Sequence, residues 1–204
     1  MSRLFLVRHG ETVSNAARIV QRPDSPLSAR GEAQAERLAH RLAPAGITRI
    51  VSSDLVRAVT TAQYIQRATG AALSFDALLQ ERNFGDLRGT PYAELDVDMF
   101  AAEYAPPNGE TWPVFHARVD RAWARVQALA AVTRGGLVVV THGLVCRSLA
   151  ARHLGLAPNE AVPEGWGNTS LTIVEARAPW RVHLLNCVLH LEGLDAAPAD
   201  SGTA

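Results

Sequence analysis

Short apolar runs alternate with helical patterns along this chain, and no other feature of the sequence restricts the fold as strongly. Three runs rich in branched residues predict buried strands at residues 3–8, 47–53 and 136–142. Each is followed by apolar residues at helical spacing, at residues 28–46, 54–70 and 143–156. Strands that alternate with helices pair in parallel and carry helices on both faces of the sheet. The sequence therefore predicts an α/β fold, a three-layer α/β/α sandwich with a mostly parallel sheet.

The remaining segments extend this sheet and its helical layers. Further strands are predicted at residues 72–76, 170–176 and 180–191, and the last two are also compatible with a terminal hairpin around Ala178 and Pro179. A long helix is predicted over residues 111–132, with Thr111 as N-cap and Pro113 in its first turn. Asp54 is placed to cap the helix that follows the second strand.

Length and charge limit the organisation of the chain and its partners. The 204 residues fit one domain, predicted at residues 1–194, with a flexible tail of small and polar residues at 195–204. Twenty Lys and Arg balance twenty Asp and Glu, so no net field favours nucleic acid or an anionic membrane surface. No apolar run approaches the roughly 20 residues of a membrane span. We expect a small-molecule partner, no nucleic acid and no membrane, and the sequence leaves a homodimer open.

Cysteine usage and the start of the chain bear on the compartment. Cys146 and Cys187 are the only cysteines, and no charged leader with an apolar segment opens the sequence. Neither secretion nor a disulfide framework is indicated, so we expect a cytoplasmic protein. Cys146 follows one turn after His142, and a small buried thiol is its expected role.

Polar side chains stand where the three predicted strands end. The first strand ends in Arg8 and His9, the third in Thr141 and His142, and the second in Ser52, Ser53 and Asp54, with Arg57 one turn further on. In open α/β sheets, ligands bind beyond the carboxyl ends of the strands, so two arginines, two histidines and a helix N-terminus should meet there. Such donors fit a phosphoryl group. The two arginine charges oppose a divalent cation, and we expect no metal and no cofactor.

Six stretches of the chain also resemble the motifs of a known family, in the family's order. They are "LVRHGETVSN", "DSPLSARGEAQA", "VSSDLVRAVTTA", "LQERNFGDLRG", "NGET...F..RV" and "VVVTHGLV". The family is the histidine phosphatase superfamily, the phosphoglycerate mutase-like group. The resemblance covers most of the chain, and implies a phosphoglycerate mutase-like fold in which residues 90–111 form a lid insertion.

The resemblance also implies roles for particular residues. His9 would be the nucleophile, and Arg8, Arg57 and His142 would hold the phosphoryl oxygens. Asn15 would contribute a side-chain donor, and Glu81 would donate the proton. We add three residues to the phosphate-binding set, namely Thr12 and Gly143 from these motifs and Gln21 from the stretch before "DSPL".

These residue types suit phosphoryl transfer, which needs an in-line nucleophile and fixed cations around the developing charge. An imidazole can accept the phosphoryl group on one nitrogen while the other donates to a carbonyl, and nearby arginines favour the neutral ring. A protonated His142 would add a third positive donor. One carboxyl can serve as acid and then as base if its pKa is raised toward neutrality. Spacing alone does not choose Glu81 for this role over Glu11, Asp54 or Asp86.

The other histidines and the tryptophans have simpler interpretations. His40 and His153 are expected at the surface, and no chemistry is assigned to His116, His183 and His190. The tryptophans are expected to be packing residues. Trp166 is the exception, because the glycine-flanked loop "EGWGNTSL" places it where it could edge the pocket.

Three departures from the family's mutases favour a phosphatase. Tyr92 stands where mutases carry a lysine, and Phe84 where they carry a tyrosine. Residues 90–111 hold no Lys or Arg but five acidic residues, which are Glu94, Asp96, Asp98, Glu103 and Glu110. We expect an acidic lid that repels a bisphosphate, with a solvated face as the alternative. Gln21 and Arg22 replace the family's glycine before "DSPL", which leaves that loop's contacts open.

The sequence therefore predicts a phosphomonoester hydrolase that acts through a phosphohistidine on His9, with Glu81 as acid and base. A cofactor-dependent phosphoglycerate mutase is the alternative enzyme. A phosphate-recognising signalling module without turnover is the alternative from a different class.

Overall fold

A six-stranded sheet forms the centre of the molecule in the computed structural model, which describes residues 2–194. The strand order is β3-β2-β4-β1-β5-β6. The strands are β1 (Arg3–Arg8), β2 (Ile47–Ser52), β3 (Ala72–Phe75), β4 (Gly136–Thr141), β5 (Leu171–Glu175) and β6 (Val182–Cys187). The first four pair in parallel, whereas β5 runs antiparallel to β1 and to β6. The predicted mostly parallel sheet and the terminal hairpin are both confirmed.

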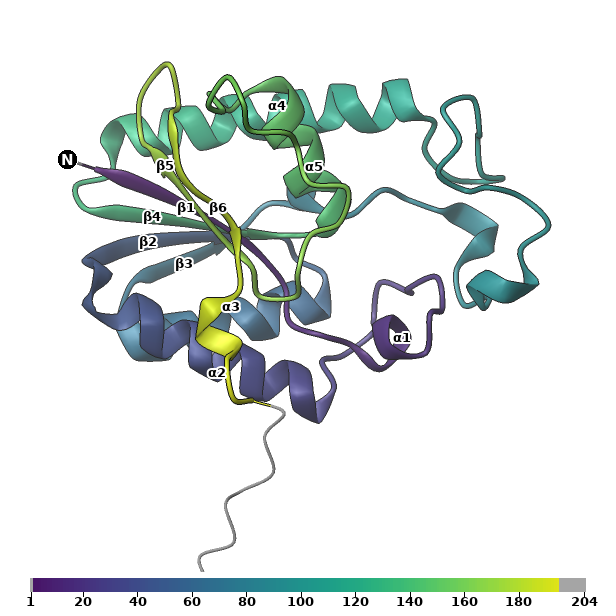
Figure 1. The fold of residues 1–204 in the computed structure, drawn as a ribbon, viewed down its shortest axis with the longest axis horizontal. Coiled ribbons are helices and arrows are strands. Elements are labelled where there is room, and N and C mark those ends of the chain that lie inside the picture. The colour runs from purple at the N-terminus through teal and green to yellow at the C-terminus, as the bar shows by residue number, and fades with distance from the viewer. Residues whose placement is uncertain (1, 195–204) are drawn as a thin grey trace, which may run out of the picture.

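Helices cover both faces of the sheet, as Figure 1 shows. On one face lie α2 (Ala29–Leu42) and α3 (Val56–Thr69), and on the other lie α4 (Trp112–Val132) and α5 (Gly143–Arg152). Strand alternation explains the two layers, because successive side chains point to opposite faces. Phe5 and Val7 of β1 pack in the core with α2 and α3, while Leu4 and Leu6 pack in the core with α4 and α5.

The predicted helices are present, with two differences at their ends. Thr111 caps α4 by accepting a hydrogen bond from the backbone N–H of Val114 at 3.4 Å, as predicted. The prediction that Asp54 caps α3 is wrong. Leu55 is the N-cap, and the carboxylate of Asp54 instead accepts a hydrogen bond from Gln80 Nε2 at 2.7 Å. The last helix, α5, ends at Arg152, before the predicted end at Gly155.

Irregular segments extend the chain beyond the carboxyl ends of the strands. A short helix, α1 (Val13–Ala16), follows β1, and residues 90–111 form a long loop on the same side of the molecule (Figure 1). Val20, Phe84 and Met99 form a small buried cluster against which Leu144 of α5 also packs. The long loop is thereby attached to the body of the domain near the start of α5. The predicted tail at residues 195–204 lies outside the described residues.

Candidate active site

The ends of β1 and β4 bring two histidines together. Arg8 pairs with Thr141 in register, and the N–H of His9 donates to the carbonyl of Thr141 at 3.0 Å. His142 follows Thr141 directly, and the ring centroids of His9 and His142 lie 5.1 Å apart. Parallel pairing of two strands that are each followed directly by a histidine is therefore sufficient to form the pair.

His9 is held in one orientation by its own backbone neighbour. Its Nδ1 lies 2.6 Å from the carbonyl oxygen of Gly10, which can only accept, so Nδ1 carries the hydrogen and Nε2 has a free lone pair. Burial lowers the pKa of His9 well below its ordinary value, and the charges of Arg57 and Arg8 lower it further. The ring is therefore neutral at neutral pH, as predicted.

The glycine of the Arg-His-Gly motif permits a close backbone contact. A Cβ at Gly10 would lie 2.5 Å from the carbonyl oxygen of Gly31, and a Cβ at Gly31 would lie 1.9 Å from the carbonyl oxygen of Glu11. The start of α2 therefore packs directly on the loop after His9, and only glycine fits at both positions.

Arg57 and His142 complete a buried group that we call the basic cluster (Arg8, His9, Arg57 and His142). Arg57 lies in the first turn of α3 and donates from Nη1 to the carbonyl of Arg22 at 3.1 Å. Burial lowers the pKa of Arg57 to about 10, despite the nearby carboxyl of Glu81, so its guanidinium remains charged. Burial and the charge of Arg57 also lower the pKa of His142 well below its ordinary value. His142 is thus neutral in this state, and the third positive donor considered above is not present here.

Several buried nitrogens of this cluster have no hydrogen-bond partner. Within residues 2–194, the buried side-chain nitrogen and oxygen atoms without a partner are Arg8 Nε, Arg57 Nε, His142 Nδ1, Trp166 Nε1 and Ser170 Oγ. Three of the five belong to the basic cluster. Native proteins pair nearly all such atoms, and the exceptions gather at functional sites. Charged guanidinium N–H groups left over in one place are the donors that an anion would satisfy.

Glu81 reaches this region from the loop after β3. Its Oε1 accepts from the N–H of Arg82 at 3.0 Å, and its Oε2 accepts from the N–H of Leu144, in the first turn of α5, at 3.1 Å. Burial raises the pKa of Glu81, although these two hydrogen bonds and the charges of Arg57 and Arg8 act in the opposite direction. A carboxyl with a raised pKa beside two arginines can both give and take a proton.

A pocket of about 310 Å³ opens at this place. Of the predicted residues, Arg8, Asn15, Gln21, Glu81 and Gly143 line it. The further lining residues are Phe84, Tyr92, Phe100, Leu144, Arg147, Glu164, Gly165 and Trp166. Trp166 was the one tryptophan expected at the pocket edge, and its backbone carbonyl also accepts a hydrogen bond from Arg8.

The remaining predicted residues lie off the pocket wall. His9, Arg57 and His142 are at most 2 % exposed and do not line the pocket, which the basic cluster reaches through Arg8. Thr12 is fully buried, and its hydroxyl caps α1 and donates to Gln21 Oε1 at 3.0 Å. Thr12 therefore supports a pocket residue rather than lining the pocket itself.

The alternative carboxyl groups are engaged elsewhere. Glu11 pairs with Arg30 at 3.0 Å, and Asp86 accepts from Asn108 Nδ2 at 2.9 Å. Neither of them lines the pocket, and nor does Asp54, which is bonded to Gln80. Glu81 and Glu164 are the carboxylates of the lining.

The expected acidic lid does not face the pocket. Four of its five acidic residues, Glu94, Asp96, Asp98 and Glu103, are exposed, and the fifth, Glu110, pairs with Arg118. The long loop instead contributes Tyr92 and Phe100 to the lining, which together with Phe84 we call the aromatic wall. The prediction of charge repulsion at the pocket is therefore wrong, and the alternative of a solvated acidic face is confirmed for those four residues.

Sequence reasoning missed Arg147, Glu164 and Phe100. Arg147 lies three residues after Leu144 on α5, so helical spacing from the strand end could have found it. Glu164 precedes Trp166 in the glycine-flanked loop that was already singled out. Phe100 lies in an irregular segment, where no periodic signal was available.

Of two further residues near the site, Cys146 matches its expected role and His153 does not. His153 is partly buried, stacks on Trp123 with ring centroids 5.6 Å apart and lies 2.8 Å from Asp120, so it is not the surface residue expected. Cys146 is fully buried, and burial raises its pKa, consistent with an inert thiol. In the described part of the chain, no group of three or more His, Cys, Asp or Glu residues could hold a metal ion, and no helix is long and apolar enough to cross a membrane.

Fold and site together define an α/β protein with a buried histidine and arginine group at the carboxyl edge of its sheet. The histidine phosphatase superfamily (branch 1) matches residues 4–188. The chain therefore belongs to this superfamily, and its fold is the phosphoglycerate mutase-like one.

Some similar proteins are named as phosphoglycerate mutases and others as phosphatases. The chain is 35% identical over 191 residues to a Yersinia enterocolitica protein named "Probable phosphoglycerate mutase GpmB", with 88% of each chain covered. It is also similar to YhfR of Bacillus stearothermophilus, with a TM-score of 0.80, 30% identity and coverage of 94% of this chain and 100% of that one. A mycobacterial glucosyl-3-phosphoglycerate phosphatase, solved with VO3, matches with a TM-score of 0.77, 30% identity and coverage of 91% and 99%.

Proposed function

We propose that this protein is a phosphomonoester hydrolase that acts through a phosphohistidine on His9. The observation that carries the proposal is the orientation of His9, whose Nδ1–H is bonded to the carbonyl of Gly10 so that Nε2 is the nucleophilic nitrogen. The neutral ring lies beside two buried guanidinium groups that have unpartnered nitrogens. A phosphoryl dianion would satisfy those nitrogens and offset the two positive charges.

The reaction proceeds in two displacements. In the first, His9 Nε2 attacks phosphorus while the bond from phosphorus to the alcohol oxygen breaks, and protonated Glu81 gives its proton to the departing oxygen. In the second, the Glu81 carboxylate takes a proton from water as the water oxygen attacks phosphorus. The bond between phosphorus and nitrogen then breaks, inorganic phosphate leaves, and Glu81 is protonated again.

The phosphate-binding residues are proposed from the pocket lining and from the charged residues of the basic cluster beneath it. Arg8, Arg57 and His142 hold the phosphoryl oxygens, with Asn15, Gln21 and Gly143 at the pocket and Thr12 supporting Gln21. A phosphate dianion would raise the pKa of His142 on binding, because an opposite charge favours the protonated ring. No cofactor or metal takes part in this scheme, and we place the enzyme in the cytoplasm.

The alcohol part of the substrate lies against the aromatic wall. A second cavity, of about 430 Å³, shares Phe100, Leu144 and Arg147 with the first and gives room for a larger group. A second phosphate would find no basic residue on the long loop, because residues 90–111 contain none. The lining outside the predicted site residues holds one positive side chain, Arg147, and one negative side chain, Glu164. We therefore expect small-molecule monophosphates with a neutral or apolar remainder to be better substrates than bisphosphates.

The relatives named as phosphoglycerate mutases make that activity the second candidate. A panel of phosphomonoesters assayed for phosphate release decides between the two, together with 3-phosphoglycerate primed with 2,3-bisphosphoglycerate. We expect release from the panel and no useful isomerisation. Rapid interconversion of 3- and 2-phosphoglycerate that depends on the bisphosphate would establish the mutase. Tight binding of a phosphopeptide without any release would establish a recognition module.

A further inference from the structure

Glu110 and Arg118 form a largely buried ion pair at the start of α4. Arg118 Nε donates to Glu110 Oε1 at 2.7 Å, and Arg118 Nη2 donates to Glu110 Oε2 at 2.8 Å. The two side chains are 12 % and 15 % exposed. Burial alone would raise the pKa of Glu110, but the hydrogen bonds from Arg118 and from the backbone of Asn83 hold it below its ordinary value. The pair is therefore fully charged, and its two parallel hydrogen bonds define its geometry.

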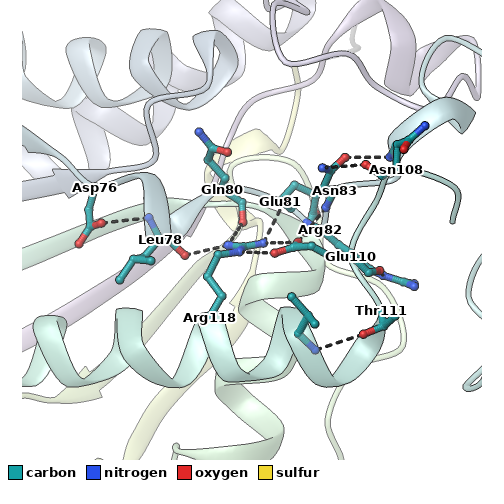
Figure 2. Close-up of polar contacts among 12 residues, drawn as sticks. Asp76, Leu78, Gln80, Glu81, Arg82, Asn83, Asn108, Glu110, Thr111 and Arg118 are labelled. Carbon is teal, nitrogen blue, oxygen red and sulfur yellow. Dashed lines mark hydrogen bonds and ion pairs between the residues drawn. The ribbon is translucent and has the colours of Figure 1, made fainter. Parts of the chain in front are cut away.

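This pair also binds the backbone on both sides of Glu81, as Figure 2 shows. Before and at Glu81, Arg118 donates to the carbonyls of Leu78 at 2.8 Å, Gln80 at 2.7 Å and Glu81 at 3.2 Å. After Glu81, the N–H of Asn83 donates to Glu110 Oε2 at 2.9 Å. The loop that carries Glu81 is thus bound at residues 78, 80, 81 and 83 by two side chains.

The same loop is tied to residues 90–111 through Arg82. Its guanidinium donates to the carbonyls of Glu110 at 3.0 Å, Met99 at 3.1 Å and Tyr104 at 2.8 Å, and it lies 4.0 Å from the ring centroid of Trp112. Arg82 is 2 % exposed. A displacement of Glu110 would therefore shift both Glu81 and the long loop that supplies Tyr92 and Phe100.

The carboxyl of Glu81 depends on this backbone for its place. Its hydrogen bonds come from two backbone N–H groups, those of Arg82 and Leu144, and none comes from a side chain within residues 2–194. We propose that Glu110 and Arg118 are positioning residues for Glu81, which hold its carboxyl where it exchanges a proton with the leaving group. This inference rests on the proposed function, because it assigns Glu81 as the acid of that reaction.

Two substitutions test the pair without removing its bulk. Glu110→Gln keeps the size but removes the charge, and leaves Arg118 buried without its counter-ion. Arg118→Lys keeps the charge but lacks the planar fork that reaches both the carboxylate and the carbonyls. Small misplacements of a catalytic group can cost about 100-fold in rate. We expect each variant to lower kcat for an alkyl phosphate by roughly 10- to 100-fold.

A comparison of two leaving groups distinguishes a positioning effect on Glu81 from a general loss of folded protein. The comparison is made on kcat/KM, which reports the first displacement, because the second displacement also needs Glu81 and is the same for every substrate. An aryl phosphate needs little proton donation in the first displacement, so its kcat/KM should fall less than about threefold in the same variants, while kcat/KM for the alkyl phosphate falls as its kcat does. A variant that is merely less well folded would lose both activities in equal proportion. Arg125→Gln is the matched control, because Arg125 lies on the same helix and pairs with Asp76 at 3.0 Å at the start of the same loop, but is 64 % exposed. Arg125→Gln should leave the activity on both substrates unchanged.

A double variant tests whether the effect passes through Glu81. If Glu110 acts only by placing that carboxyl, Glu81→Gln with Glu110→Gln should be no slower on the alkyl phosphate than Glu81→Gln alone. Losses that multiply would overturn the proposal. So would equal losses of kcat/KM on the two substrates, or no loss on either.

A measurement that needs no turnover distinguishes a failure of the proposed function from a failure of the positioning role. The absence of phosphate release from every ester by the unsubstituted enzyme would count against the proposed function. In that case the pKa of Glu81, measured by NMR on protein with labelled glutamate, still tests the pair. Displacement of the carboxyl toward water in Glu110→Gln should return its pKa toward the ordinary value, and an unchanged pKa would overturn the positioning role.

Discussion

The basic cluster and the aromatic wall meet at one pocket but are built in different ways. His9, Arg57 and His142 are at most 2 % exposed and come from strand ends and a first helical turn, whereas Phe100 is 47 % exposed and comes from an irregular loop. The cluster therefore has little freedom to adapt, while Phe100 on the wall is accessible to solvent and to the alcohol part of a substrate. We infer that the cluster sets the reaction and the wall selects among substrates.

The energetic costs of the two regions also differ. Burial of two guanidinium groups with unpartnered nitrogens costs stability that packing elsewhere must offset. The phenylalanine rings of the wall cost nothing comparable, because Phe84 is an apolar side chain that is buried and the exposure of Phe100 is ordinary for a protein surface. Substitutions in the cluster should therefore change rate steeply, and substitutions in the wall should change it only modestly.

The largest effect is expected at His9. His9→Ala should lower phosphate release by at least about 10⁴-fold, because removal of a nucleophile abolishes the covalent route. Rapid acid-free quenching with labelled substrate should trap a phosphoryl group on the unsubstituted enzyme that is labile to acid and stable to alkali. His183→Ala is the control, since that side chain is half-exposed and lies in β6. Label found on a residue other than His9 would contradict the assignment.

A smaller loss is expected at Glu81. Glu81→Gln should slow hydrolysis of an alkyl phosphate by roughly 10²- to 10⁴-fold, the usual range for a general acid and base. The first step with an activated aryl phosphate should suffer less. Glu164→Gln is the control, because Glu164 lines the same pocket, but within residues 2–194 it is Glu81 whose carboxylate is hydrogen-bonded to the start of α5. An equal loss in the two variants would remove the distinction between these carboxylates.

The two regions also differ in how far the sequence alone predicts them. The basic cluster was predictable because parallel strands place their carboxyl ends at one edge, so residues next to strands in sequence are neighbours in space. Glu81 came only from the resemblance, since its position depends on the N–H of Leu144, 63 residues away. The acidic residues of the long loop were misplaced because composition does not tell which side of an irregular backbone faces a pocket.

Activity should fall on both sides of a pH range set by His9 and Glu81. His9 must be neutral to attack, and its pKa is lowered by burial and by Arg57, so the acidic limb of kcat/KM should lie below the ordinary histidine value of 6.5. Glu81 must be protonated to donate, and its pKa is raised by burial, so the alkaline limb should lie above 4.5. The second ionisation of the substrate phosphate has a pKa of about 6. It is measured separately, and its contribution is removed from the pH profile of kcat/KM.

Glu81→Gln provides the check on this profile. The alkaline limb should disappear, because the amide does not titrate, while the acidic limb stays where it was. An alkaline limb that persists in Glu81→Gln would assign that ionisation to another group. An acidic limb above pH 6.5 would contradict the neutral state of His9.

The smallest effect is expected on the aromatic wall. Phe100→Ala should lower kcat/KM for an aryl phosphate by roughly two- to tenfold, because a ring contact contributes on the order of 0.5–1.5 kcal/mol. The loss should appear in KM with kcat unchanged, since the ring touches the alcohol part before and during the reaction alike. Methyl phosphate, which is too small to reach the wall, should be unaffected. Phe75→Ala is the matched control, because Phe75 is 50 % exposed but lies on the edge strand β3 and lines a different cavity. A fall in kcat, or an equal loss with methyl phosphate, would show that Phe100 supports the reaction itself and that the two regions are not separate in function.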